Sequence, residues 1–233
     1  AGAGGAPSEG VIISLLKAND NEIILGMGSE PTDLVLSKAD KKFHIPYSDN
    51  SEYKNCLLKL LNTEKPDFVH FQNDLEIYNA SLIRGEILQT GTKLFMPDHN
   101  TIDTCVHKYK TFLKCREAGI KVPTNMIINN EKDLKKAFSE LGDENGKVWI
   151  RASSIGGGGK GALPTNDFLF AKGWIDRYDA WGDFVAAEML TPNTVTWLSI
   201  WFEGELVVAQ TRIRKGWTHG NRTVSGVTGV TKV

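Results

Sequence analysis

The chain has 233 residues, a formal net charge of −1 and a hydrophobic fraction of 41%. That fraction can build a core and excludes wholesale disorder, and the length suits one large domain or two small ones. The near-zero charge argues against a nucleic-acid partner, because dedicated binders carry a basic excess. Three cysteines cannot form a disulfide framework, so we expect a reducing, cytoplasmic location. No apolar run reaches about 18 residues, so we expect no membrane partner.

Short apolar segments alternate with helical patterns in the first half of the chain. The apolar segments predict strands at residues 22–27, 42–45, 67–71 and 92–95. Helical spacing of apolar residues predicts a first helix that Ser8 can cap, a second at 51–62 that Ser51 can cap, and a third at 74–89. This alternation predicts an α/β fold with a Rossmann-like parallel sheet.

The second half follows a different pattern. It predicts helices at 101–118 and 130–141, and strands at 147–151, 183–189, 195–202 and 205–212. Glu203-Gly204 joins the last two strands and is typical of a tight hairpin, so we expect an α+β unit with an antiparallel sheet. Residues 1–97 carry a net charge of −4 and residues 98–233 a net charge of +3. We therefore predict two domains, 1–97 and 98–233.

A first glycine-rich segment opens the chain, where Gly2, Gly4 and Gly5 precede the first predicted helix. Glycines before a helix let a phosphate approach the backbone and the helix dipole. However, Pro7 stands where the dinucleotide-binding fingerprint needs a glycine. The segment favours a tight strand-to-helix turn, and a nicotinamide-dependent oxidoreductase remains an alternative.

A second glycine-rich segment follows the predicted strand at 147–151. It consists of Gly156, Gly157, Gly158, Gly159 and Lys160. Consecutive glycines lose much backbone entropy on ordering, but they leave several N–H groups open to wrap an anion. Arg151 at the end of the strand adds a fixed positive charge, and no Ser or Thr follows Lys160 as a P-loop would require. The pattern predicts an anion-binding flap between two strands, with a disordered linker as the alternative.

These segments, in this order, resemble the ATP-grasp superfamily, most nearly the synthetase units of the carbamoyl-phosphate synthase large subunit. The resemblance runs over nearly the whole chain and implies a Rossmann-like domain followed by an ATP-grasp domain. It implies that Lys108, which precedes a Gly119-Ile120 turn, and Arg151 are the phosphate-binding cations. It also implies that the second glycine-rich segment is the flap over the phosphates.

The resemblance extends to the end of the chain. It implies that Glu188, Met189 and Leu190 form the hinge that binds adenine. Arg212, Arg214 and His219 lie in the stretch that meets the acyl phosphate and the acceptor. The family usually has an acid for the ribose where this chain has Val195. Its metal ligands, a Glu or Gln and a Glu-x-Asn pair, are expected beyond Val233.

The resemblance therefore implies an ADP-forming, ATP-dependent carboxylate-amine ligase that forms an acyl phosphate. It implies ATP with Mg²⁺ or Mn²⁺ as cofactors and a small-molecule carboxylate and amine as substrates, and it leaves a homo-oligomer open. A non-catalytic nucleotide-binding module is the alternative, because neither the ribose acid nor the metal ligands are found in the sequence.

Three further expectations come from spacing alone. Arg212 and Arg214 alternate with Ile213, so both should point to one side of a strand and share an anion site. Trp197 and Trp201 should likewise share one side of a strand, in the core. A zinc site using Cys105, His107 and Cys115 lacks a fourth ligand at sensible spacing.

Overall fold

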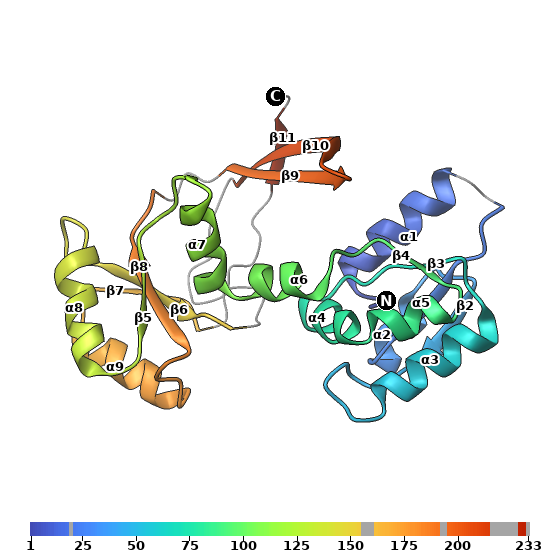
Figure 1. Cartoon of the computed structure of the whole chain (residues 1–233), viewed down its shortest axis with the longest axis horizontal. Helices are drawn as coiled ribbons and strands as arrows, with labels where there is room; N and C mark the ends of the chain where they lie inside the picture. The colour runs from blue at the N-terminus through green and yellow to red at the C-terminus, as the bar shows by residue number, and fades with distance from the viewer. Residues whose placement is uncertain (19–20, 155–160, 192–194, 215–227, 232–233) are drawn as a thin grey trace. The chain divides into compact units, whose positions relative to one another are not determined.

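The computed structural model describes residues 1–18, 21–154, 161–191, 195–214 and 228–231, with only the backbone for 214 and 228–231. The chain divides into two compact units, Ala1–Val106 and His107–Val233 (Figure 1). The predicted boundary after residue 97 lies just before α6 (His99–Val106), which belongs to the first unit. None of the described helices is long and apolar enough to cross a membrane.

The first unit contains two pairs of parallel strands. β1 (Leu25–Gly28) pairs with β2 (Lys41–His44), and β3 (Phe68–Val69) pairs with β4 (Lys93–Leu94). The helices of this unit are α1 (Ala6–Ala18), α2 (Pro31–Leu36), α3 (Tyr53–Glu64), α4 (Asp74–Leu82), α5 (Arg84–Gln89) and α6. The alternation of parallel strands and helices confirms the predicted α/β organisation, although most of the strands are shorter than predicted and α2 was not predicted.

The core of the first unit is built on α3. Tyr53, Leu57 and Leu61 recur every fourth residue, so they share one helix face and are buried in one cluster with residues of β1, β3, α4 and α5. Ser51 does not cap this helix, because the capping position is Glu52, which makes no side-chain capping bond. The predicted helix at 74–89 is two helices, because Ile83 leaves helical geometry at φ −111°.

The second unit contains a four-stranded antiparallel sheet in the order β5-β8-β6-β7. Its strands are β5 (Asn125–Ile128), β6 (Val148–Ala152), β7 (Leu163–Thr165) and β8 (Phe184–Glu188), and its helices are α7 (Lys108–Glu117), α8 (Glu131–Leu141) and α9 (Phe168–Arg177). Side chains of α8 and α9 form one buried cluster with Val148, Ile150 and Phe184 of the sheet. Figure 1 shows α7 on the other side of this sheet. The sequence patterns did not predict β5 or α9, and they predicted a strand after the second glycine-rich segment without giving the residues of β7.

A three-stranded antiparallel sheet follows, formed by β9 (Val195–Phe202), β10 (Glu205–Arg214) and β11 (Thr228–Thr231). Phe202 pairs with Glu205, which confirms the predicted hairpin. Trp197 and Trp201 share one side, with ring centroids 6.2 Å apart. Their predicted place in the core is wrong, since the two side chains are 54% and 47% exposed. The described hydrophobic clusters contain no side chain from these strands.

Candidate functional site

Lys108 occupies the first position of α7. The predicted helix at 101–118 is broken at His107, which is extended at φ −98° and ψ 107°, and a new helix starts at Lys108. A first-turn N–H has no partner within its own helix, and that of Lys108 donates to the carbonyl of Ser153 at 2.9 Å. Lys108 Nζ donates to the carbonyl of Ser154 at 3.2 Å. Both ends of Lys108 are therefore held by the two residues that follow β6.

Arg151 lies on β6, on the face opposite the cluster formed with α8 and α9. Its neighbour Ile150 is fully buried in that cluster, and successive strand residues point to opposite faces. The Nε of Arg151 is buried and has no hydrogen-bond partner among the described residues. Burial lowers the pKa of Arg151, but arginine keeps its proton at neutral pH. The sheet thus carries a partly buried positive charge with an unused donor, close to the residues that hold Lys108.

Two strands flank the second glycine-rich segment, as predicted, and they pair with each other in antiparallel orientation. β6 ends at Ala152 and β7 begins at Leu163, which pairs with Ile150. Gly156 to Gly159 and Lys160 lie outside the described residues. Gly161, the next described residue, has φ +68°, and a Cβ there would lie 2.8 Å from Cζ of Phe184. Its carbonyl accepts a hydrogen bond of 2.9 Å from Trp174 Nε1, so the C-terminal root of the segment is fixed by packing and by one hydrogen bond.

Asp183 fixes the other root of this segment. Its backbone carbonyl accepts from the Ser153 N–H at 2.7 Å, and its Oδ2 accepts from the Ser154 hydroxyl at 2.7 Å. Sequence reasoning missed Asp183, Ser153 and Ser154. The serines are separated from the glycines only by Ile155 and could have been noticed, but no pattern links Ser154 to a residue 29 positions away.

The predicted hinge lies at the end of β8. The Glu188 N–H donates to the Thr124 carbonyl at 3.2 Å, and the Glu188 carboxylate accepts from the Thr124 N–H at 2.9 Å. Both groups of Glu188 are thus used to hold the start of β5. Met189 is half-buried and Leu190 is exposed. Arg151 pairs with Val185, three residues before Glu188, which places the hinge about 10 Å along the strand from Arg151.

The second group of predicted site residues lies on the three-stranded sheet. Arg212 pairs with Thr196 and Val230, and its Nε is buried without a hydrogen-bond partner in the part of the chain that the structure describes. Arg214 occupies the last position of β10 and is described by its backbone alone, while His219 lies outside the described residues. The shared anion site of the two arginines stays a prediction. Val195 begins β9 and is 63% exposed.

An acidic side chain of the same unit accepts a hydrogen bond from the first glycine-rich segment. Glu9 lies in the first turn of α1 and accepts from the Gly4 N–H at 2.8 Å and from the Lys38 N–H at 2.9 Å. Ser8 does not cap α1, because it lies within the first turn and its hydroxyl donates to the Ala1 carbonyl. The Glu9 carboxylate therefore already uses the Gly4 amide that would have to bind a dinucleotide phosphate. This disfavours the nicotinamide-dependent alternative.

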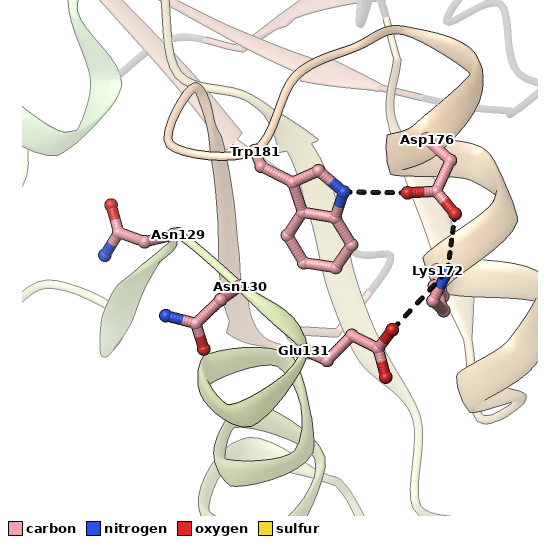
Figure 2. A pocket seen from close by; sticks show the side chains of 6 residues that line it. All are labelled: Asn129, Asn130, Glu131, Lys172, Asp176 and Trp181. Atoms are coloured by element: carbon pink, nitrogen blue, oxygen red, sulfur yellow. Dashed lines mark hydrogen bonds and ion pairs between the residues drawn. The ribbon is translucent and has the colours of Figure 1, made fainter.

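Figure 2 shows a pocket of about 260 Å³ formed by residues of α8, α9 and the loops beside them. It is lined by Asn129, Asn130, Glu131, Lys172, Asp176 and Trp181. Lys172 contacts Asp176 at 2.7 Å and Glu131 at 3.5 Å, and Trp181 Nε1 donates to Asp176 at 2.7 Å. Because these charges already pair with one another and no predicted site residue lines the pocket, we assign it no ligand.

The described residues contain no group of three or more His, Cys, Asp and Glu side chains able to hold a metal ion. The zinc alternative therefore finds no support among Cys105, His107 and Cys115, all of which are described.

Comparison with solved structures identifies the fold. A carboxyaminoimidazole ribonucleotide synthase from Aspergillus clavatus, solved with ATP, matches with a TM-score of 0.67 at 15% identity, over 90% of this chain and 52% of that one. The N5-carboxyaminoimidazole ribonucleotide synthetase of Thermus thermophilus matches with a TM-score of 0.69 at 12% identity, over 92% and 54%. The biotin carboxylase domain of the Hydrogenobacter thermophilus 2-oxoglutarate carboxylase, solved with MgADP and bicarbonate, matches with a TM-score of 0.67 at 15% identity, over 92% and 49%.

The chain spans about half the length of these solved structures. No protein-family model matches the sequence, and no curated protein matches it. The chain shares the fold of these solved structures, and its combination of parallel and antiparallel sheets agrees with the fold that the sequence resemblance implied.

Proposed function

We propose that this chain is the nucleotide-binding part of an ATP-dependent ligase, which phosphorylates a carboxylate to an acyl phosphate that an amine or similar nucleophile then attacks. The observation that carries the proposal is the partly buried guanidinium of Arg151 near the residues that hold Lys108. This guanidinium has an Nε that no described residue accepts from, and it lies on the sheet face opposite the core, two residues before the Ser153 carbonyl that holds Lys108. Unpaired buried donors are costly, and a polyphosphate would offset that cost.

In this proposal the triphosphate lies between Lys108, Arg151 and the second glycine-rich segment. Phosphoryl transfer depends mainly on positioning and on stabilising negative charge. Arg151 binds phosphate oxygens with a planar guanidinium that stays charged, and Lys108 supplies a second cation. Mg²⁺ or Mn²⁺, which we expect to arrive with the nucleotide, neutralises phosphate charge, and no described residue is assigned to hold it.

The adenine would lie at the hinge. The Glu188 amide is already bonded to Thr124, so we assign the adenine edge to the backbone of Met189 and Leu190 rather than to Glu188. The distance of about 10 Å along β8 between this point and the partner of Arg151 suits a nucleotide that extends from its base to its phosphates. Arg212, Arg214 and His219 remain the residues that we propose for the acyl phosphate and the acceptor.

Thermal unfolding with nucleotide tests the proposal. A ligand that binds only the folded state stabilises it by about 2.7 kcal/mol at a concentration of 100 Kd, so MgATP should raise the Tm of the wild-type chain. Arg151→Ala should abolish this shift because it removes the buried cation. Arg177→Ala, at the exposed end of α9, is the matched control and should keep the full shift. A wild-type Tm that responds to NADH but not to MgATP would contradict the proposal.

A nucleotide-binding module without turnover is the second candidate. The observation that favours it is Val195, an exposed apolar residue at the position where the resemblance implies an acid for the ribose. ADP release in the presence of ATP, a carboxylate and an amine separates the two candidates. Sustained release that Arg151→Ala removes would exclude the module, whereas binding of MgATP without release would favour it.

A further inference from the structure

Asp183 connects three segments that are distant in the sequence. Its carbonyl and its carboxylate accept hydrogen bonds from Ser153 and Ser154, each at 2.7 Å. The carbonyls of the same two serines accept from the backbone N–H and the Nζ of Lys108, at 2.9 and 3.2 Å. The path therefore runs from the start of β8, through the end of β6, to the first residue of α7.

The position of Asp183 itself is fixed by the core. Its N–H donates to the Ala180 carbonyl at 3.0 Å, and the preceding Gly182 donates to the Ile128 carbonyl at 2.8 Å. The following residue, Phe184, is 1% exposed and belongs to the buried cluster with α8 and α9. Asp183 is thus anchored on one side, while its carboxylate reaches Ser154 on the other.

The hydrogen bond from the Ser154 hydroxyl to the Asp183 carboxylate joins two side chains, so substitutions can remove it. Ser153 pairs with Asp183 through the backbone alone, so no side-chain substitution removes that bond. The carbonyl of Ser154, by contrast, must face Lys108 Nζ, and the Asp183 carboxylate is the side-chain group that holds Ser154 in place. A hydrogen bond to a charged group is stronger than one between neutral groups, so the carboxylate suits this role.

We propose that Asp183 is a positioning residue for the phosphate site, because it fixes Ser154 and thereby holds the ammonium group of Lys108 beside β6. Lys108 belongs to the proposed nucleotide site, so the role of Asp183 in ligand binding rests on the proposed function. The positioning of Lys108 in the free protein does not.

Chemical labelling of lysine amines measures that positioning without any nucleotide. Brief acetylation with acetic anhydride, quantified by mass spectrometry, reports how readily each ammonium group leaves its partner. Asp183→Ala and Ser154→Ala should each raise labelling of Lys108 several-fold, and the double variant should add little, because both remove the same hydrogen bond. Lys114 on the same helix should be unchanged. Asp183→Asn, which keeps an acceptor oxygen, should restore most of the wild-type protection.

A matched control separates positioning from general loosening of the fold. Asp167 also accepts one local hydrogen bond, from the Phe170 N–H at 3.0 Å, at the start of α9. Asp167→Ala should therefore lower the Tm without changing the labelling of Lys108. If Lys108 is labelled equally in wild type, Asp183→Ala and Ser154→Ala, the inference is overturned. A rise for Lys114 as large as that for Lys108 would also overturn it.

The nucleotide arm of the experiment uses MgATP. In the wild type, MgATP should protect Lys108 from acetylation, and Asp183→Ala should weaken MgATP binding by about three- to tenfold, the factor that one hydrogen bond supplies. If the labelling of Lys108 depends on Asp183 but MgATP does not protect Lys108, the proposed function is contradicted and the positioning role of Asp183 stands. If MgATP protects Lys108 but its labelling does not depend on Asp183, the positioning role is contradicted and the proposed function stands.

Discussion

The two glycine-rich segments of this chain differ in the charged groups that lie near their described ends. In the first, the amide of Gly4 is bonded to the carboxylate of Glu9, which also accepts from Lys38. Near the described ends of the second lie two cationic side chains, those of Lys108 and Arg151, together with the Asp183 carboxylate, which accepts from Ser154. The first segment therefore binds an anion of its own chain, whereas we propose that the second binds one from outside. Glycine content alone does not separate a structural turn from a ligand site, because the neighbouring charges decide.

The largest effect that would test this difference is expected at Gly4. A Cβ there would lie 1.9 Å from the Asp33 carbonyl oxygen, and the residue has φ +90°. Gly4→Ala should lower the free energy of unfolding of the first unit by about 3 kcal/mol or more, because left-handed strain and a backbone clash add together. Urea denaturation measures this. Gly10→Ala in α1, where a Cβ meets nothing within 4 Å, should instead stabilise by about 0.5–1 kcal/mol. Equal stability of the two variants would contradict the structural role of this segment.

A smaller, pH-dependent effect is expected at Glu9. Burial would raise the pKa of Glu9, but hydrogen bonds from Ser37, Lys38 and Gly4 outweigh it and hold that pKa below its usual value. A depressed pKa stabilises the folded state above the unfolded pKa of about 4.3, and this stability is lost as the pH falls through the folded pKa.

Glu9→Gln should therefore be less stable than wild type at pH 7, by about 1 kcal/mol. The two proteins should converge in urea denaturation as the pH falls below about 4. Glu52→Gln, in the exposed turn before α3, should show no such convergence because it starts with no difference. If the difference in free energy of unfolding between Glu9→Gln and wild type is the same at every pH, the negative charge of Glu9 does not stabilise the first segment.

The smallest effect is expected at Trp174, beside the second segment. Trp174→Phe keeps an aromatic ring in contact with Tyr178 and Phe170 but removes the Nε1 donor to the Gly161 carbonyl. Loss of one neutral hydrogen bond should lower the free energy of unfolding by about 1 kcal/mol and weaken MgATP binding less than Arg151→Ala does. Isothermal titration and urea denaturation measure both quantities. If Trp174→Phe weakens MgATP binding as much as Arg151→Ala does, the hydrogen bond at Gly161 matters as much for binding as the cation, which would contradict the comparison.

The two antiparallel sheets mark how far strand patterns predict the fold. Apolar runs located β6, β8, β9 and β10, because alternating or continuous apolar residues favour strands. The same patterns did not predict burial, since Ile150 of β6 is fully buried whereas Trp201 of β9 is 47% exposed. Burial depends on which helices lie over a sheet, and that is a property of the packed unit. The turns at Ile83 and His107 were missed for a related reason, because helical spacing continues across both breaks.

The sequence by itself determined the order of most strands and helices, the change from parallel to antiparallel pairing, and the motif of Arg151 followed by glycines. These features depend on residues close together in the chain, where periodicity and turn chemistry act directly. Only the tertiary structure decided that Glu9 closes the first glycine-rich segment and that Asp183 reaches Ser154. Both are hydrogen bonds between side chains and groups supplied by other elements of the fold, and they form only after packing has fixed the distance between those elements.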